Sequence, residues 1–201
     1  MRRFVTPTDR VEAFSDGVFA VIITIMVLEL RVPPRTDFHS LLQTLPSVAT
    51  YAVSFLFIGI YWNNHHHMLR ASRGVDGSAM WANLNLLFWL SLVPFSTAWL
   101  GRNPSALGPT VLYATVFLLD GVAYSILQTR LVAVNGPNTP FAKAVSRDVK
   151  GKLSLLLYAI GIGAAFVTTI VTDIVIVAVA IMWLVPDRRY EPLIELDDQP
   201  R

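Results

Sequence analysis

The chain has 201 residues, of which 54% are hydrophobic and only 15% are charged, and its mean hydropathy is +0.53. Soluble domains carry about a quarter charged residues, so this composition predicts an integral membrane protein, and the length suits about six spans of roughly 20 residues. The net charge of +2 is too small to indicate a nucleic-acid-binding protein, and the absence of cysteine excludes disulfides, thiolate metal sites and cysteine nucleophiles.

The first apolar run predicts a membrane-spanning helix over residues 11–30. Thr6 is the expected N-cap, Pro7 suits the first helical position, and Asp9 lies in the first turn, where a negative charge is favourable. The prolines at 33–34 end the helix. Because no small-residue cleavage site follows and more apolar runs come later, we interpret the run as a retained span rather than a signal peptide.

Five further spans are predicted in chain order, over residues 41–67, 81–99, 109–131, 153–169 and 170–185. Pro94 is expected to kink the third span. Turn signals rich in Asn, Gly and Pro predict a loop over residues 133–147. The last two spans must join in a tight turn near residues 168–173, unless they form one long helix. We expect one helical domain over residues 1–189 and a polar tail over residues 190–201.

The basic residues predict the orientation of the chain. With six spans both termini lie on one side, and 13 of the 16 basic residues fall there: Arg2, Arg3, Arg10, Arg70, Arg73, Arg130, Lys143, Arg147, Lys150, Lys152, Arg188, Arg189 and Arg201. Only Arg31, Arg35 and Arg102 fall on the other side. The positive-inside rule therefore predicts a multi-pass protein of the cell's inner (plasma) membrane with cytoplasmic N- and C-termini.

One face of the first span forms a narrow stripe. A helix turns by about 100° per residue, and this angle aligns Arg10, Phe14, Gly17, Val21, Thr24, Ile25 and Leu28. Ser15 and Asp16 lie on other faces. Polar groups inside a membrane usually face protein or water. The stripe is either a packing seam or a functional surface with a hydroxyl in it.

The start of this span resembles the signature of the transmembrane protein 175 family, which consists of potassium-permeable channels. The signature is an Arg, three variable residues and then Phe-Ser-Asp, and here it is Arg10 followed by Phe14, Ser15 and Asp16. The end of the second span over 61–67 and the third span over 85–95 also resemble that family.

The resemblance implies a homotetramer in which the first helix of each six-helix subunit lines a central pore. It places the pore constriction at Val21, Ile25 and Leu28, with Thr24 influencing selectivity. Val21 departs from the Ile or Leu that relatives carry, so the narrowest ring is expected to be wider or to shift to Ile25 or Leu28. The permeant ions implied are potassium and other monovalent cations.

The expected selectivity mechanism differs from that of a carbonyl filter, because the sequence contains no Thr-Val-Gly-Tyr-Gly loop. A narrow apolar ring can gate by excluding water. Pore radius, the cost of ion dehydration and the Thr24 hydroxyls then set a modest preference for potassium over sodium. Potassium in transit is the only metal ion expected, and no cofactor is expected.

Arg10 and Asp16 are expected to anchor the pore helix rather than to conduct. They lie about 120° apart on the helix and cannot pair directly, so each should bind another helix. The natural partner is the polar end of the second span: Trp62, Asn63, Asn64, His65, His66 and His67. Three consecutive histidines point in different directions and cannot clamp one ion from one helix, which favours a polar network over a metal site.

Other polar residues leave alternatives open. Asp120 in the fourth span is either a proton or ion relay or an acid paired with a neighbouring helix. Glu29 either draws cations to the outer mouth or reaches the interface. The sequence contains neither a nucleophile elbow nor an intramembrane zinc motif, so it does not indicate an enzyme. An ion- or proton-coupled secondary transporter is the main alternative to a channel, although we find no repeat of the kind transporters show; a scaffold without transport is a third.

Overall fold

The structure is a computed structural model that describes residues 5–185, 189–190 and 193. Every regular element in this part of the chain is helical: α1 (Asp9–Leu28), α2 (Phe38–Leu42), α3 (Leu45–Arg70), α4 (Gly77–Leu90), α5 (Val93–Arg102), α6 (Leu107–Asn135), α7 (Pro140–Ser146), α8 (Val149–Ala165) and α9 (Thr169–Leu184). Arg2, Arg3, Arg188, Arg201 and most of the predicted tail over 190–201 lie outside the described residues. The two described residues of that tail are Tyr190 and Leu193, and Tyr190 is buried.

Four stretches of helix are long and apolar enough to cross a membrane: Asp9–Leu28, Leu45–Arg70, Gly77–Arg102 and Leu107–Asn135. The helix Thr169–Leu184 is apolar but shorter. These stretches agree with the first four predicted spans within a few residues. The prediction of an all-α membrane protein is therefore confirmed.

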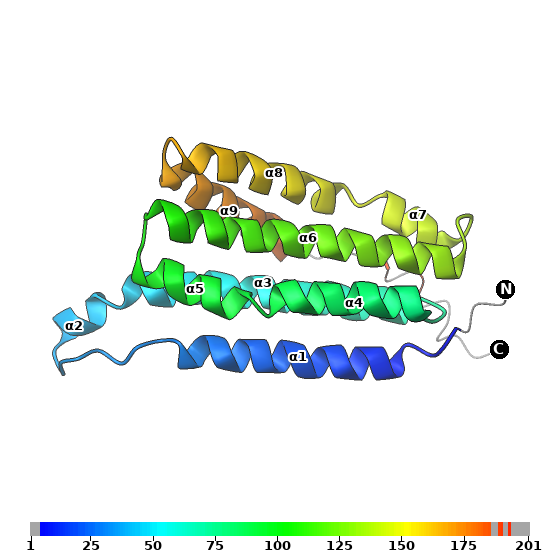
Figure 1. Ribbon diagram of the computed structural model, residues 1–201, viewed down its shortest axis with the longest axis horizontal. Helices are drawn as coiled ribbons and strands as arrows, with labels where there is room; N and C mark the ends of the chain where they lie inside the picture. The colour runs from blue at the N-terminus through cyan, green and yellow to red at the C-terminus, as the bar shows by residue number, and fades with distance from the viewer. Residues whose placement is uncertain (1–4, 186–188, 191–192, 194–201) are drawn as a thin grey trace.

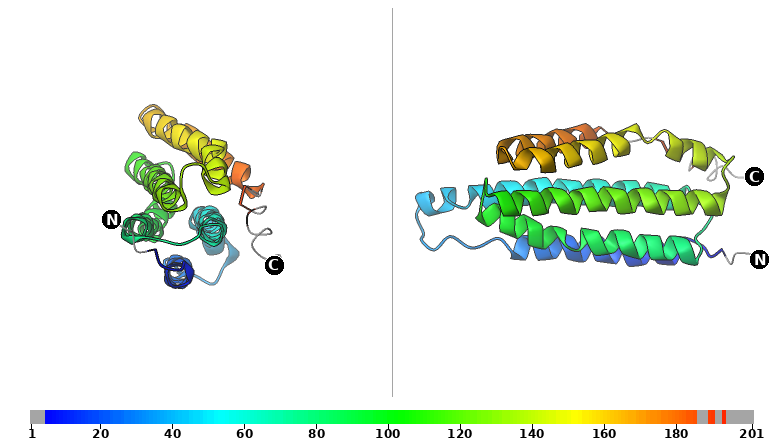
Figure 2. Two further views of the ribbon diagram at one scale, coloured as in Figure 1. Left: turned by 90° about the vertical axis from the view of Figure 1, so that its right-hand side faces the viewer. Right: turned by 45° about the horizontal axis from the view of Figure 1, so that its top comes forward.

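The helices run side by side along the long axis of the molecule, as Figure 1 shows. α1 lies at the edge of the bundle and packs against α3, α4 and α5, whereas α8 and α9 form a pair on the opposite side (Figure 2). α6 lies between these groups and contacts α4, α5, α7, α8 and α9. The start of α1, the α3–α4 connection and α7 lie at one end of the bundle, which we call the proximal end; α2 lies at the other, distal end (Figure 1).

The core between these layers is aromatic and contains a few hydroxyl groups. Phe57 and Phe117 have ring centroids 4.5 Å apart, and Tyr113 packs edge-on against Phe117. The Tyr113 hydroxyl lies 2.7 Å from Ser54 Oγ, which also accepts a 2.8 Å hydrogen bond from Thr97. These side chains join α3, α5 and α6, and their buried hydroxyls satisfy one another inside the apolar core.

The predicted kink at Pro94 is confirmed as a break between α4 and α5. α4 ends at Leu90 and α5 begins at Val93. Pro94 lies in the first turn of α5, where its missing N–H has no intrahelical acceptor to lose. One predicted span is therefore two helical segments in line.

The predicted N-cap at Thr6 is wrong. α1 begins at Asp9 with Thr8 at the cap position, while Thr6 forms an isolated β-bridge with Val75, in which each backbone N–H donates to the other residue's carbonyl at 2.9 Å. The chain passes so close to the α3–α4 connection that a Cβ on Gly74 would lie 2.8 Å from the Thr6 carbonyl oxygen. A long-range backbone pairing, invisible to a local pattern, displaced the cap.

The predicted loop over 133–147 is also wrong in part. α6 continues to Asn135, and residues Pro140–Ser146 form α7. The Thr139 hydroxyl accepts a 3.3 Å hydrogen bond from the Ala142 N–H, and Pro140 follows at the first helical position. Thr139 and Pro140 are therefore a helix start rather than a turn.

The join between the last two predicted spans is a tight turn, so the alternative of one long helix is wrong. α8 ends at Ala165 and α9 begins at Thr169. The Thr172 hydroxyl donates a 2.7 Å hydrogen bond to the Gly161 carbonyl across the pair. Close contact at a glycine lets a threonine bond directly to a neighbouring helix backbone, a pattern typical of helix packing in membranes.

Candidate functional site

α1 has two distinct faces. The face toward the bundle buries Ser15, Phe19, Ile22 and Met26, which follow the helical period. This buried face packs against α3, α4 and α5. The other face is left uncovered by the described residues, although it is as apolar as the first.

The predicted constriction residues all lie on the uncovered face. Val21, Ile25 and Leu28 are 54%, 44% and 81% exposed, and Thr24 is exposed between them. The Thr24 hydroxyl donates a 2.9 Å hydrogen bond to the Val21 carbonyl of its own helix. Its proton is therefore engaged, and the oxygen lone pairs of this exposed residue remain available to water or a cation.

A buried hydrogen-bond chain fixes the opposite face of α1. His65 on α3 lies with Nε2 2.7 Å from Asn83 Oδ1 on α4, and Asn83 Nδ2 donates to Ser15 Oγ at 3.0 Å. Since the amide oxygen only accepts, His65 Nε2 carries the proton in this arrangement. Ser15 in turn donates to the Val11 carbonyl at 2.7 Å. Three helices are thus joined by polar groups that water does not reach.

A second set of contacts lies beside this chain. Trp62 Nε1 donates a 2.9 Å hydrogen bond to Asp16 Oδ1, and the Trp62 ring stacks on His66 with centroids 6.1 Å apart. The Nδ1 atom of His66 faces the carboxylate of Glu12. Asp16 therefore meets the end of α3, as its position in the sequence suggested.

The structure brings together only part of the predicted network. Phe14 is exposed, and within the described part of the chain no hydrogen bond or ion pair links Arg10 or Asn63 to another helix. The Asn64 side chain donates to the Ile60 carbonyl of its own helix, and the Asn64 backbone carbonyl accepts a 3.1 Å hydrogen bond from the Tyr124 hydroxyl on α6. His67 follows His66 on α3, and their rings meet edge-on.

Sequence reasoning missed two members of the anchor, Glu12 and Asn83. Asn83 is a buried amide in the middle of an apolar helix, and a polar residue in such a place is itself a signal. We call the seven residues that make these contacts the anchor cluster: Glu12, Ser15, Asp16, Trp62, His65, His66 and Asn83.

The distal end of α1 carries one exposed ion pair. Arg102 Nη2 lies 2.6 Å from Glu29 Oε2 and also donates to the Glu29 carbonyl at 3.4 Å. The charge of Glu29 is thus neutralised by Arg102 on α5. An exposed pair of this kind stabilises the fold by at most about 1 kcal/mol.

The histidines do not converge on a common point. His65 bonds to Asn83 and His66 faces Glu12, and no group of three or more His, Asp or Glu side chains that could hold a metal ion occurs among the described residues. The arrangement is that of an interhelical polar network.

Comparison with known proteins identifies the family. Residues 10–94 match the family described as "Endosomal/lysosomal potassium channel TMEM175". A potassium channel of Chryseobacterium sp. (strain P1-3) is 43% identical over 182 residues, which cover 90% of this chain and 95% of that protein. A potassium channel of Streptomyces collinus is 35% identical over 174 residues, covering 81% of this chain and 84% of the relative.

The fold agrees with a solved structure of the same family. The crystal structure of a lysosomal potassium-selective channel TMEM175 homolog from Chamaesiphon minutus superposes with a TM-score of 0.80 at 29% sequence identity. The superposition covers 90% of this chain and 97% of that one. The matched region contains the Arg10, Phe14, Ser15 and Asp16 signature and the anchor cluster, and the chain belongs to the TMEM175 family, in its prokaryotic branch.

Proposed function

We propose that this protein is a potassium-permeable, modestly potassium-selective cation channel in which four copies of the chain enclose a central pore lined by α1. The observation that carries the proposal is the uncovered apolar stripe of Val21, Ile25 and Leu28 on a helix whose other face is firmly anchored. Relatives that share most of the chain are named potassium channels. The family is one of channels and not of enzymes.

In a tetramer, the uncovered apolar face of α1 would meet the same face of the other copies. A single subunit leaves α1 at the edge of its bundle (Figure 2), and an apolar face of this kind in a membrane protein meets either lipid or another copy. Fourfold closure around α1 would place four Leu28, four Ile25 and four Val21 side chains in successive rings. Closed rotational symmetry is the usual arrangement of such assemblies.

The subunit spans the membrane six times in this proposal. Besides the four long stretches, α8 and α9 have 17 and 16 residues, which gives each a length of about 25 Å, slightly less than the roughly 30 Å hydrocarbon core. The described basic residues Arg70, Arg73, Arg130, Lys143 and Arg147 lie at the proximal end. The positive-inside rule makes that end cytoplasmic, in the plasma membrane of a prokaryotic cell.

The chemistry of permeation follows from side chains rather than carbonyls. A ring of apolar side chains is closed to ions when it is too narrow to stay wet. Thr24 would lie between the rings of Val21 and Ile25, and its oxygen lone pairs are not used by its hydrogen bond to the Val21 carbonyl. A cation that has lost part of its hydration shell would find replacement oxygens there, and potassium loses hydration water at lower cost than sodium.

The decisive experiment is a planar-bilayer recording of the purified protein with opposing potassium and sodium gradients. Discrete single-channel steps and a reversal potential on the potassium side support the proposal. Slow, saturable flux without steps would instead support a coupled transporter, and absence of flux would support a scaffold. Native mass spectrometry in detergent should report four chains per particle.

Variants locate the pore within the chain. Ile25→Asn and Leu28→Asn should each raise conductance or reduce selectivity, because an amide hydrates the ring. Val27→Asn is the matched control: Val27 is a similarly exposed apolar residue of α1, about 160° from Ile25 around the helix. Unchanged permeation in both ring variants, or an equal effect of Val27→Asn, would remove α1 from the pore.

A further inference from the structure

Asp120 is the most unusual polar group outside the proposed pore. It lies near the middle of α6 and is fully buried, and neither carboxyl oxygen has a hydrogen-bond partner among the described residues. The alternative of a conventionally paired acid, which the sequence left open, is therefore not what the structure shows. An unpaired carboxylate in a membrane interior is costly by several kcal/mol, so something must neutralise it.

Among the described residues, no ion pair or hydrogen bond joins a cation to Asp120, and Arg189 pairs with Asp148 at 3.2 Å instead. α4 has no basic or acidic side chain, and α9 has only the acid Asp173. Arg102 on α5 pairs with Glu29, and Lys150 on α8 donates to the Val185 carbonyl near the proximal end. The basic residue of α6 itself, Arg130, lies ten positions and about 15 Å along the helix from Asp120.

Two tyrosine hydroxyls lie beside the Asp120 position. Tyr61 on α3 and Tyr158 on α8 line the same cavity as Gly121, the residue that follows Asp120. The Tyr61 hydroxyl lies against the α6 backbone, 3.7 Å from where a Cβ on Gly121 would be. These side chains can accept a hydrogen bond but carry no charge.

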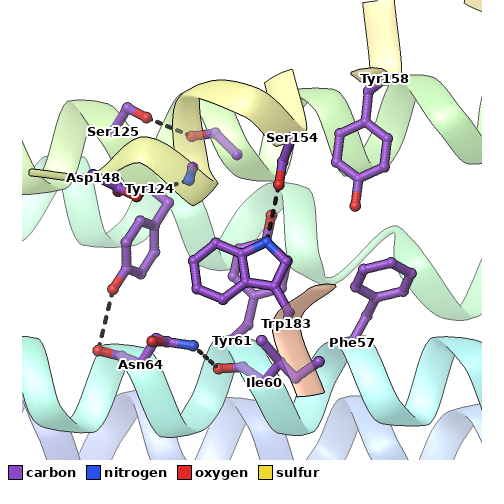
Figure 3. Close-up of a pocket in the computed structure, with 12 residues that line it drawn as sticks. Phe57, Ile60, Tyr61, Asn64, Tyr124, Ser125, Asp148, Ser154, Tyr158 and Trp183 are labelled. Atoms are coloured by element: carbon purple, nitrogen blue, oxygen red, sulfur yellow. Dashed lines mark hydrogen bonds between the residues drawn. The ribbon is translucent and has the colours of Figure 1, made fainter. Parts of the chain in front are cut away.

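A small chamber adjoins this site (Figure 3). It has a volume of about 40 Å³ and is bordered by Tyr61, Asn64, Tyr124, Asp148, Ser154 and Tyr158. A water molecule needs roughly 10–15 Å³ of such space and several polar partners, so two or three waters fit. The chamber runs from the two tyrosines beside Asp120 toward Asp148, the N-cap of α8 at the proximal end.

We propose that Asp120 is a proton-binding site within each subunit, separate from the pore of α1, and that water in the chamber connects it to the proximal end. In the binding step a hydronium ion gives up its proton: one of its O–H bonds breaks, an O–H bond forms on a carboxyl oxygen of Asp120, and a neutral water remains. The new O–H donates to a tyrosine hydroxyl or to a chamber water. No electron transfer is involved.

Infrared spectroscopy of the reconstituted full-length protein tests whether Asp120 binds a proton. At neutral pH the wild type should show the carbonyl-stretching band of a protonated carboxylic acid, although an ordinary aspartate is ionised there. The band should shift when aspartate is labelled with ¹³C and should disappear in Asp120→Asn. Asp173→Asn, which removes the acid of α9, should leave it in place.

The isotope label makes the assignment to aspartate independent of whether the variant folds. Absence of a labelled acid band at neutral pH would overturn the proton site. A carboxylate band that responds to sodium or potassium instead would mean that a metal cation neutralises Asp120, which also refutes it. Because the site is separate from α1, Asp120→Asn channels should keep the potassium conductance of the wild type, and loss of current from correctly assembled tetramers would overturn the separation.

Hydrogen–deuterium exchange of the band tests the water connection. Ser125 borders the chamber and its hydroxyl donates only to the Gly121 carbonyl of its own helix, so Ser125→Leu fills space that water would occupy. Exchange should slow at least roughly tenfold, which corresponds to a barrier higher by about 1.4 kcal/mol. Thr129→Leu, one turn along α6 and outside the chamber lining, is the control. Exchange as fast in Ser125→Leu as in the control would refute the connection.

Discussion

Replacing Asn83 by leucine should destabilise the protein more than any other single change of a polar residue in the anchor cluster. Asn83 accepts from His65 and donates to Ser15, and all three side chains are almost completely buried. Leucine has the same number and branching of side-chain heavy atoms, so the change removes the polar pairing while keeping the shape of the side chain.

The magnitude follows from the groups left behind. Two hydrogen bonds are lost, each contributing about 0.6–1 kcal/mol inside a membrane protein. The His65 N–H is then buried without an acceptor, at a cost of about 1–3 kcal/mol. Ser15 keeps its hydrogen bond to the Val11 carbonyl, so it adds little to the loss of stability. The sum is about 2–5 kcal/mol, which for a chain of this size lowers Tm by roughly 4–20 °C.

Thermal unfolding in detergent, followed by size-exclusion chromatography of heated samples, measures this shift. Asn85→Leu is the matched control, because Asn85 is exposed on the same helix and the substitution is chemically identical. The reasoning fails if the two variants unfold at the same temperature. It also fails if Asn83→Leu is more stable than the wild type, since that would mean that apolar packing outweighs the network.

Two further substitutions probe the contacts of α1 and α5. Gly101→Ala should lower Tm measurably, because its Cβ would lie 2.9 Å from the Ser47 Cα and force α3 and α5 apart; Gly163→Ala, which meets nothing within 4 Å, should not. Trp62→Phe should lower Tm by only about 2 °C, because the bond to Asp16 is partly exposed and contributes about 1 kcal/mol; a shift as large as that of Asn83→Leu would place the main anchor at Trp62.

The sequence predicted the helices better than their ends. Apolar length and prolines located the first four membrane-crossing stretches and the break at Pro94, because span length and the missing proline N–H are local properties. The dipeptide Thr-Pro occurs at both Thr6 and Thr139, yet only Thr139 caps a helix. Thr6 pairs instead with Val75, and a partner 69 residues away leaves no trace in the local pattern.

For the candidate site, the sequence predicted the two faces of α1 better than it predicted the contacts of individual residues. Projecting α1 at the helical period separated the uncovered stripe of Val21, Ile25 and Leu28 from the anchored side. The partner of Asp16 was found in the polar end of α3, but Arg10 and Asn63 were assigned contacts that the described structure does not contain. Asn83 was missed because choosing among several polar residues on α4 requires knowing which face meets α1.

The two ends of α1 are subject to different constraints on change. The anchor residues of α1, Glu12, Ser15 and Asp16, lie in its first two turns, and each contacts α3 or α4. Beyond Ile22 the exposed apolar residues of α1 are largely uncovered by the described part of the subunit, so a substitution at Ile25 or Leu28 alters this uncovered face while leaving the bundle intact. In the channel that we propose, natural or directed evolution could therefore change permeation without first finding compensating mutations elsewhere in the fold.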